Sequence, residues 1–117
     1  MVYLLMIYAN EADWATKSES EMAPIMRTHE ELEQELRRAG KYRGCGGLAA
    51  SSAATTVRLS GSTPIVTDGP YAETKEQLGG YYLVESQTID EVLALAARIP
   101  GFGSRAVEVR PVLDFRP

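Results

Sequence analysis

The sequence predicts an α+β fold in which an antiparallel sheet carries two helices on one face. Apolar runs rich in β-forming residues lie near both ends of the chain and again in its second half. Two other segments place apolar residues at spacings of three and four, which is typical of amphipathic helices. The resulting order is β, α, several β, α, β, and residues 1–117 suffice for a single domain.

The first half of the chain predicts a buried strand followed by a long helix. Residues 2–8 are apolar at every position, as in a strand that is buried on both faces. Ser18 or Ser20 is expected to cap the helix, because Glu21 follows Ser18 at the spacing of a capping box. The helix is expected to stop at Gly40. Its inward stripe comprises Met22, Ile25, Met26, His29, Leu32 and Leu36.

The second half predicts further strands and a second helix. Segments rich in β-branched or aromatic residues and bounded by turn residues predict strands at 42–48, 55–60, 63–67, 80–86 and 106–113. Gly61-Ser62 is expected to form the two-residue turn of an inserted β-hairpin. Thr88 is expected to cap the second helix, and Pro100-Gly101 to end it.

This order of elements is that of a ferredoxin-like fold. Two helices cover one face of such a sheet, yet residues 2–8 and 81–84 are apolar on both faces. A bare apolar face of this size is unusual in a soluble monomer. We therefore expect a homodimer that is closed by the helix-free face of the sheet. The alternative is that long polar side chains and the 55–67 hairpin cover this face within one chain.

Composition and charge exclude several classes of protein. A net charge of −4, with basic residues interleaved among acidic ones, argues against a surface that binds nucleic acid. The N-terminus lacks a basic region and its apolar run is too short to cross a bilayer, so we expect no membrane association. A single cysteine, Cys45, rules out a disulfide within the chain and fits a reducing compartment. We therefore expect a cytoplasmic protein.

His29 and Asp68 are the candidate catalytic residues. His29 lies in the inward stripe of the first helix, and a histidine that titrates near neutrality is a natural general base. Asp68 ends a predicted strand in an Asp-Gly-Pro turn, where its carboxylate can orient the imidazole. The alternatives are a structural histidine at the helix edge and a carboxylate that only stabilises its turn. Pro70 can also begin a short helix that runs through Gln77.

Aromatic and basic side chains are further candidates for binding a ligand. They are Tyr8, Tyr71, Lys75, Tyr81 and Arg110. The two basic side chains favour a small organic anion over a cation, although acidic neighbours flank Lys75. Each candidate has a plain structural alternative, such as a core tyrosine or a surface ion pair between Arg110 and Glu108.

The sequence offers no site for a common cofactor. Residues 44–49 match a dinucleotide-binding fingerprint only formally, because they follow a helix and no helix comes after them. One histidine and one cysteine cannot supply an ordinary set of zinc ligands. We therefore expect neither a nucleotide nor a metal.

The segment VTDGPYAETKEQLGGYYLVE at residues 66–85, followed by DEVLALAARIP and VEVRPV, resembles the YCII-related proteins of the DGPF subgroup. Their Asp-Gly-Pro-Phe motif reads Asp68-Gly69-Pro70-Tyr71 here, and the segments YLLMIY and ATTVRLSG also fit. The resemblance thus covers nearly the whole chain. It implies a ferredoxin-like fold, assembly as a dimeric α/β barrel, and an active-site cleft with a histidine and an aspartate, here His29 and Asp68.

Two classes of function follow. Related YCII-type proteins include a dehydrochlorinase that acts on a chlorinated hydroxyquinol, so the resemblance implies a small acid–base enzyme whose substrate is a small organic molecule. Proton abstraction or elimination would suit one base without a metal or nucleotide. Some DGPF proteins are encoded beside extracytoplasmic-function sigma factors, which implies the alternative of a non-catalytic ligand-binding or regulatory module.

Overall fold

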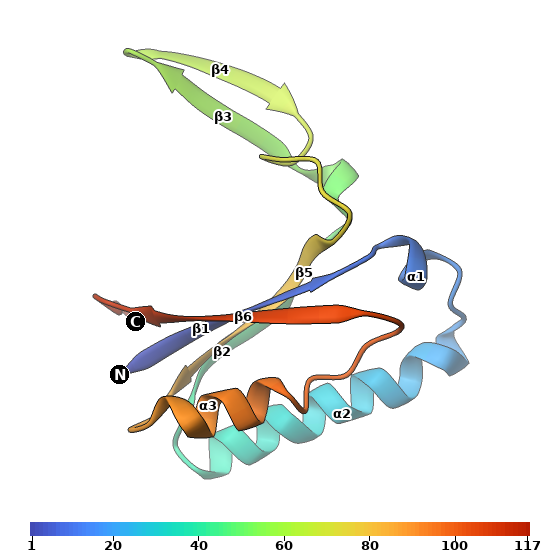
Figure 1. Ribbon diagram of the computed structural model, residues 1–117, viewed down its shortest axis with the longest axis vertical. Coiled ribbons are helices and arrows are strands. Elements are labelled where there is room, and N and C mark those ends of the chain that lie inside the picture. The colour runs from blue at the N-terminus through green and yellow to red at the C-terminus, as the bar shows by residue number, and fades with distance from the viewer.

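The computed structural model describes all residues, 1–117, and has the predicted α+β architecture (Figure 1). The strands are β1 (Val2–Ala9), β2 (Tyr42–Gly47), β3 (Thr55–Ser60), β4 (Thr63–Asp68), β5 (Gln77–Glu85) and β6 (Arg105–Val112). The helices are α1 (Ala12–Ala15), α2 (Glu19–Arg38) and α3 (Ile89–Ala96), with a 3₁₀ turn, η1, at Ser51–Ala53. None of these helices is long and apolar enough to span a membrane.

Four strands form an antiparallel sheet in the order β2-β5-β1-β6. The first strand of the chain therefore lies in the middle, paired with β5 on one side and β6 on the other. Helices α2 and α3 lie together against one face of this sheet (Figure 1). The prediction of a ferredoxin-like fold is confirmed.

The long helix α2 begins and ends where its terminal residues predict. The Ser18 hydroxyl accepts a hydrogen bond from the backbone N–H of Glu21, and the Glu21 carboxylate accepts one from the Ser18 N–H, which completes the capping box. Gly40 follows the helix with a φ of +69°, a left-handed conformation that glycine adopts without strain. The capping prediction is therefore confirmed for Ser18, and Thr88 caps α3 in a similar way.

Alternation along β1 divides its side chains between two environments. Tyr3 and Leu5 point toward the helices and belong to the buried core, and Ile7 packs against it. The most deeply buried side chains come from the central strands, from both helices and from the segment after α3. They are Leu5, Leu32, Val84, Val92 and Ile99. Burial of such side chains contributes roughly 1.5–3 kcal/mol each, so this layer holds α2 and α3 on the sheet.

The opposite face of the sheet carries no helix. Leu4, Met6 and Tyr8 of β1 lie on it beside Tyr81 and Leu83 of β5, as the strand register requires. These side chains are only partly buried in the single chain, so the apolar helix-free face that the sequence predicts is present.

The hairpin β3-β4 rises away from the sheet and forms a separate two-stranded sheet (Figure 1). Gly61 and Ser62 make its turn, as predicted, and Gly61 has a φ of +63°. Large apolar side chains are exposed on it: Val57, Leu59, Ile65 and Val66. The hairpin therefore does not cover the helix-free face within one chain.

The structure differs from the sequence-based expectations in two places. Helix α1 was not expected, and it forms a single turn that places Trp14 beside Phe102, with ring centroids 4.9 Å apart. The short helix considered from Pro70 is wrong, because residues 69–76 form bends and irregular backbone, and β5 already begins at Gln77. The first segment is thus a helical turn that brings Trp14 to Phe102, whereas the second is a loop at the base of the hairpin.

Candidate functional site

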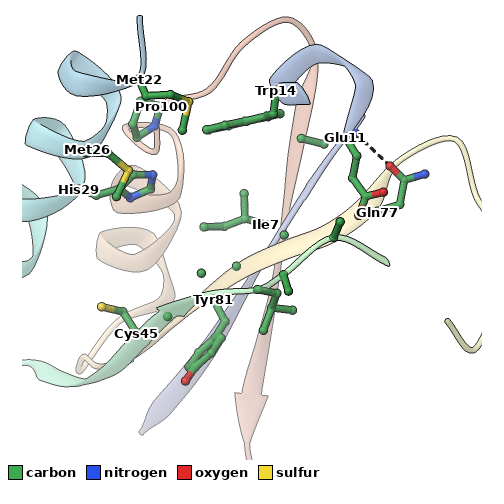
Figure 2. Close-up of a pocket in the computed structure, with 18 of the residues that line it drawn as sticks. Ile7, Glu11, Trp14, Met22, Met26, His29, Cys45, Gln77, Tyr81 and Pro100 are labelled. Carbon is green, nitrogen blue, oxygen red and sulfur yellow. Dashed lines mark hydrogen bonds between the residues drawn. The ribbon is translucent and has the colours of Figure 1, made fainter. Parts of the chain in front are cut away.

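A cavity of about 750 Å³ lies between α2, α1 and the helix-covered face of the sheet (Figure 2). Thirteen of its 23 lining residues are hydrophobic, which is typical of a site for a small organic molecule. Four glycines contribute to its wall: Gly46, Gly47, Gly79 and Gly80. Gly47 and Gly80 lie two residues from Cys45 and Tyr82 and share their face of the sheet, so the missing side chains at these two positions leave room for the cavity.

His29 projects from α2 into this cavity, and Met22 and Met26 lie beside it on the same helix (Figure 2). The imidazole Nδ1 is 2.6 Å from the hydroxyl of Tyr82 on β5, and the two rings are stacked with centroids 5.9 Å apart. Tyr82 points toward the helices because it follows the same alternation as Val84. The pair therefore joins a helix to the central sheet at the wall of the cavity.

Burial determines the charge of both members of this pair. Burial lowers the pKa of His29 below its ordinary value of 6.5, so the imidazole is neutral at neutral pH. Burial also raises the pKa of Tyr82, so its phenol stays protonated. A neutral imidazole has one nitrogen that donates and one that accepts, and Nδ1 is the nitrogen bonded to the Tyr82 hydroxyl. In the tautomer whose Nδ1–H donates to the Tyr82 oxygen, Nε2 is left as the acceptor that can take a proton from a substrate, and Tyr82 fixes the orientation of the ring.

Cys45 lines the cavity next to a carboxylate. Its thiol donates a hydrogen bond to Glu33 at 3.4 Å and accepts one from the hydroxyl of Tyr42, also at 3.4 Å. Arg37 forms an ion pair with Glu33 at 2.9 Å and stacks over Tyr42 at 4.1 Å. Burial is the main cause of a raised pKa for Cys45, so the thiol stays protonated and is a poor nucleophile. Cys45 and Glu33 of this cluster line the cavity beside β2.

Glu11 supports the other end of the cavity, near α1 (Figure 2). Its carboxylate accepts hydrogen bonds from the backbone N–H and the hydroxyl of Ser51, at 2.6 and 2.8 Å. The backbone N–H of Glu11 donates to the side chain of Gln77 at 3.0 Å. These contacts connect the start of α1 to η1 and β5, and Trp14 of α1 also lines the cavity.

The sequence matches the YCII-related domain over residues 1–116. The chain belongs to the YCII-related family. It is also 36% identical over 121 residues to a protein of Rhizobium meliloti (strain 1021) that is itself described as uncharacterized. That alignment covers 100% of this chain and 96% of the relative.

In this YCII-related protein, the predicted catalytic residues are separated within one chain. His29 lines the cavity, and its hydrogen bond is with Tyr82. Asp68 ends β4 in the projecting hairpin, is exposed, and does not line the cavity. The single chain therefore brings His29 to a site but does not bring Asp68 to His29.

The other predicted binding residues lie mostly outside the cavity. Tyr81 contributes to its wall, but its ring turns to the helix-free face and lies over Gly46 (Figure 2). Tyr8 is on that same face. Lys75 and Tyr71 are exposed in the loop after β4, where the Arg58 guanidinium lies over the Tyr71 ring at 5.1 Å. These positions reflect the alternation of strands and the direction of the hairpin.

Arg110 forms an ion pair with Glu108 on the same side of β6, which is the structural alternative weighed from the sequence. Neither Arg110 nor Lys75 lines the cavity. An anionic ligand was expected because of the positive charges of Lys75 and Arg110, and neither charge lies at the wall of this cavity.

Glu33 and Tyr82 are cavity residues that were not predicted from the sequence. Met22, Met26, His29 and Glu33 follow one another at spacings of three and four, so they lie on one side of α2. Tyr82 is paired with Cys45 across β5 and β2, which places both on the face toward this helix. The stripe could have been extended to Glu33 from the sequence, whereas the pairing required the strand register.

Proposed function

We propose that this protein is a small acid–base enzyme that acts on an apolar organic molecule bound between α2 and the sheet. The observation that carries the proposal is the neutral His29 imidazole held by Tyr82 at the wall of a mainly hydrophobic cavity. An imidazole with a pKa below neutrality is available to accept a proton at neutral pH. Its lowered basicity limits the reaction to substrates with an activated C–H or O–H group.

The chemistry that suits this site is proton transfer without a covalent intermediate. His29 would remove a proton from a substrate atom. The freed electron pair would either expel a leaving group, after which the imidazolium releases its proton to solvent, or form an enolate that is protonated at another atom. The second course returns the proton from the imidazolium and regenerates the free enzyme. Tyr82 serves as the positioning residue, because its hydroxyl touches Nδ1 of the base. Cys45 is not assigned a catalytic part, because its thiol stays protonated.

The helix-free face and the Asp68-Gly69-Pro70-Tyr71 motif bear on how the protein assembles and on its place within the family. We propose that two cytoplasmic copies associate through the helix-free face, which carries Leu4, Met6 and Leu83. The Asp68-to-Tyr71 motif supports membership of the DGPF subgroup. A part for Asp68 in the chemistry requires that the second copy bring it to the cavity, since the hairpin leaves it exposed in the single chain.

The second candidate is a non-catalytic module that binds a small molecule and reports it to a regulatory partner. One observation favours it. The cavity contains a single imidazole base and no reactive thiol, so apolar binding is its most evident capacity. The two candidates differ in whether a bound molecule exchanges a proton with His29.

Solvent deuterium exchange distinguishes the candidates across a range of possible substrates. A library of small phenols, ketones and halogenated aromatic compounds is incubated with the protein in D₂O and analysed by mass spectrometry. We expect deuterium incorporation or an elimination product with the parent protein, reduced about 100-fold or more in His29→Gln. Equal exchange in the two proteins would refute the role of His29. Ligand binding without any exchange would support the module.

A further inference from the structure

The charged groups that line the cavity all carry the same sign. They are Glu11, Glu30 and Glu33, and no lysine or arginine is among the lining residues. His29, the remaining titratable base, has its pKa lowered by burial and adds no positive charge at neutral pH. Carboxylates are negative at this pH, so the cavity has a negative field.

Only one of the three carboxylates is compensated by a cation. Glu33 forms its ion pair with Arg37, which lies outside the lining. Glu11 is held by the N–H and hydroxyl of Ser51, which are neutral donors. Glu30 is exposed at the rim, one residue after His29, and forms no ion pair. Two negative charges at the wall and rim of the cavity therefore have no cationic partner.

This field discriminates between ligands of similar shape. An anion would lose its hydration in an apolar cavity and find no cation to replace it, while the carboxylates repel it. A cation would be attracted by Glu11 and Glu30. Trp14 adds the face of an indole ring, and aromatic rings of this kind attract cations within about 6 Å. The thioethers of Met22 and Met26 supply polarisable apolar contacts.

We propose that the cavity selects apolar molecules that are positively charged or uncharged, with a preference for amines, and that it rejects carboxylates and phosphates. This inference rests on the cavity of the proposed function and names the class of its ligand. It differs from the expectation drawn from Lys75 and Arg110, because those side chains lie elsewhere.

The test uses three probes with one skeleton: 2-phenylethylamine, 2-phenylethanol and phenylacetate. Trp14 is the only tryptophan of the chain and lines the cavity, so its fluorescence, excited at a wavelength that the probes do not absorb, reports binding of each. We expect the amine to bind at least tenfold tighter than phenylacetate, with the alcohol between them. Equal or tighter binding of phenylacetate would overturn the proposal, and so would the absence of binding by all three at tens of millimolar.

Substitutions that remove one negative charge test whether the preference for amines arises from the carboxylates of the cavity. Glu30→Gln and Glu11→Gln should each reduce the ratio of amine to phenylacetate affinity severalfold. Glu31→Gln is the matched control, because Glu31 is the next residue of α2, is exposed, and does not line the cavity. A ratio that is unchanged in Glu30→Gln and in Glu11→Gln would overturn the assignment.

The outcome can be separated from that of the proposed function. His29→Gln should leave the order of the three affinities unchanged, because the imidazole is neutral. A parent protein without proton exchange would defeat the enzyme proposal and leave the charge preference standing. Exchange that depends on His29 but occurs best with carboxylate substrates would defeat the charge preference alone.

Discussion

The imidazole of His29 and the hydroxyl of Tyr82 are joined at 2.6 Å, which connects the middle of α2 to the centre of the sheet. The bond is made between a half-buried side chain and one that is almost fully buried. Its two partners come from positions that are 53 residues apart in the chain, so it forms only when the helix is packed in its final register.

Replacing Tyr82 with phenylalanine should remove this bond while preserving the ring. We expect a loss of about 1 kcal/mol in the free energy of unfolding, because a buried imidazole nitrogen loses its partner. Urea denaturation measures this loss. Tyr81→Phe is the control, since it makes the same change at the adjacent residue, whose ring lies on the other face of the sheet. Equal effects of the two substitutions would contradict a special role for the His29–Tyr82 bond.

The stability of the protein should fall on mild acidification because of His29. Its pKa is lowered by burial in the folded state, whereas the unfolded chain takes up a proton near 6.5. As the pH falls through 6.5 toward the folded value, the unfolded state binds more protons, so the free energy of unfolding decreases. Denaturation of the parent and of His29→Gln between pH 7.5 and 5 should give curves that diverge, with the steeper loss in the parent.

The titration of stabilising carboxylates affects the free energy of unfolding at a lower pH than the titration of His29 does. Hydrogen bonds lower the pKa of groups such as Glu33, bonded to Arg37, and Glu91, bonded to Lys41, below 4.5. Stability from such groups is present above 4.5 and is lost only at lower pH, in the parent and the variant alike. Parallel curves down to pH 5 would show that His29 titrates alike in the folded and unfolded chains.

The helix-free face should support a homodimer. Leu83→Glu introduces a charge at the middle of that face, and we expect it to shift the protein from dimer to monomer at micromolar concentration. Light scattering over a dilution series measures the change. Ile89→Glu is the control, because Ile89 is also an exposed aliphatic residue but begins α3, where an acidic side chain is tolerated. A parent protein that is monomeric across the series would rule out this assembly.

Glu33 should restrain the reactivity of Cys45. Burial raises the pKa of the thiol, and the hydrogen bond to Glu33 raises it further. We expect Glu33→Gln to lower that pKa and to accelerate alkylation by iodoacetamide near pH 8, with the rate followed from pH 7 to 10. Glu35→Gln is the matched control, since it removes a different ion-paired carboxylate of α2, the partner of Arg98. An unchanged profile in Glu33→Gln would mean that burial alone sets the pKa of Cys45.

Local patterns in the sequence were sufficient for most of the fold. The capping box at Ser18, the stop at Gly40 and the two-residue turn at Gly61 depend on neighbouring residues, and they form as predicted. The inward position of His29 also followed from the helical spacing of its stripe. Such features are encoded locally, so they can be deduced before any long-range contact is known.

Features that depend on long-range geometry could not be deduced in the same way. The partner of His29 is set by the angle at which α2 crosses the sheet and by the register of β5, neither of which a local pattern specifies. The position of Asp68 depends on the direction in which the hairpin leaves the sheet. That direction is determined at η1 and in the loop of residues 69–76, where turn propensities fit several paths.

The central position of β1 has a consequence for how the chain folds as it is synthesised. This strand is synthesised before every other element in residues 1–117, whereas its partners β5 and β6 are synthesised after β2, β3 and β4. The nascent chain therefore carries a strongly apolar, unpaired strand until β5 and β6 have been made, and chaperones bind segments of this kind. A product truncated before Arg105 would leave one edge of β1 without hydrogen-bond partners. Incomplete copies should thus be recognised and degraded instead of accumulating as folded fragments.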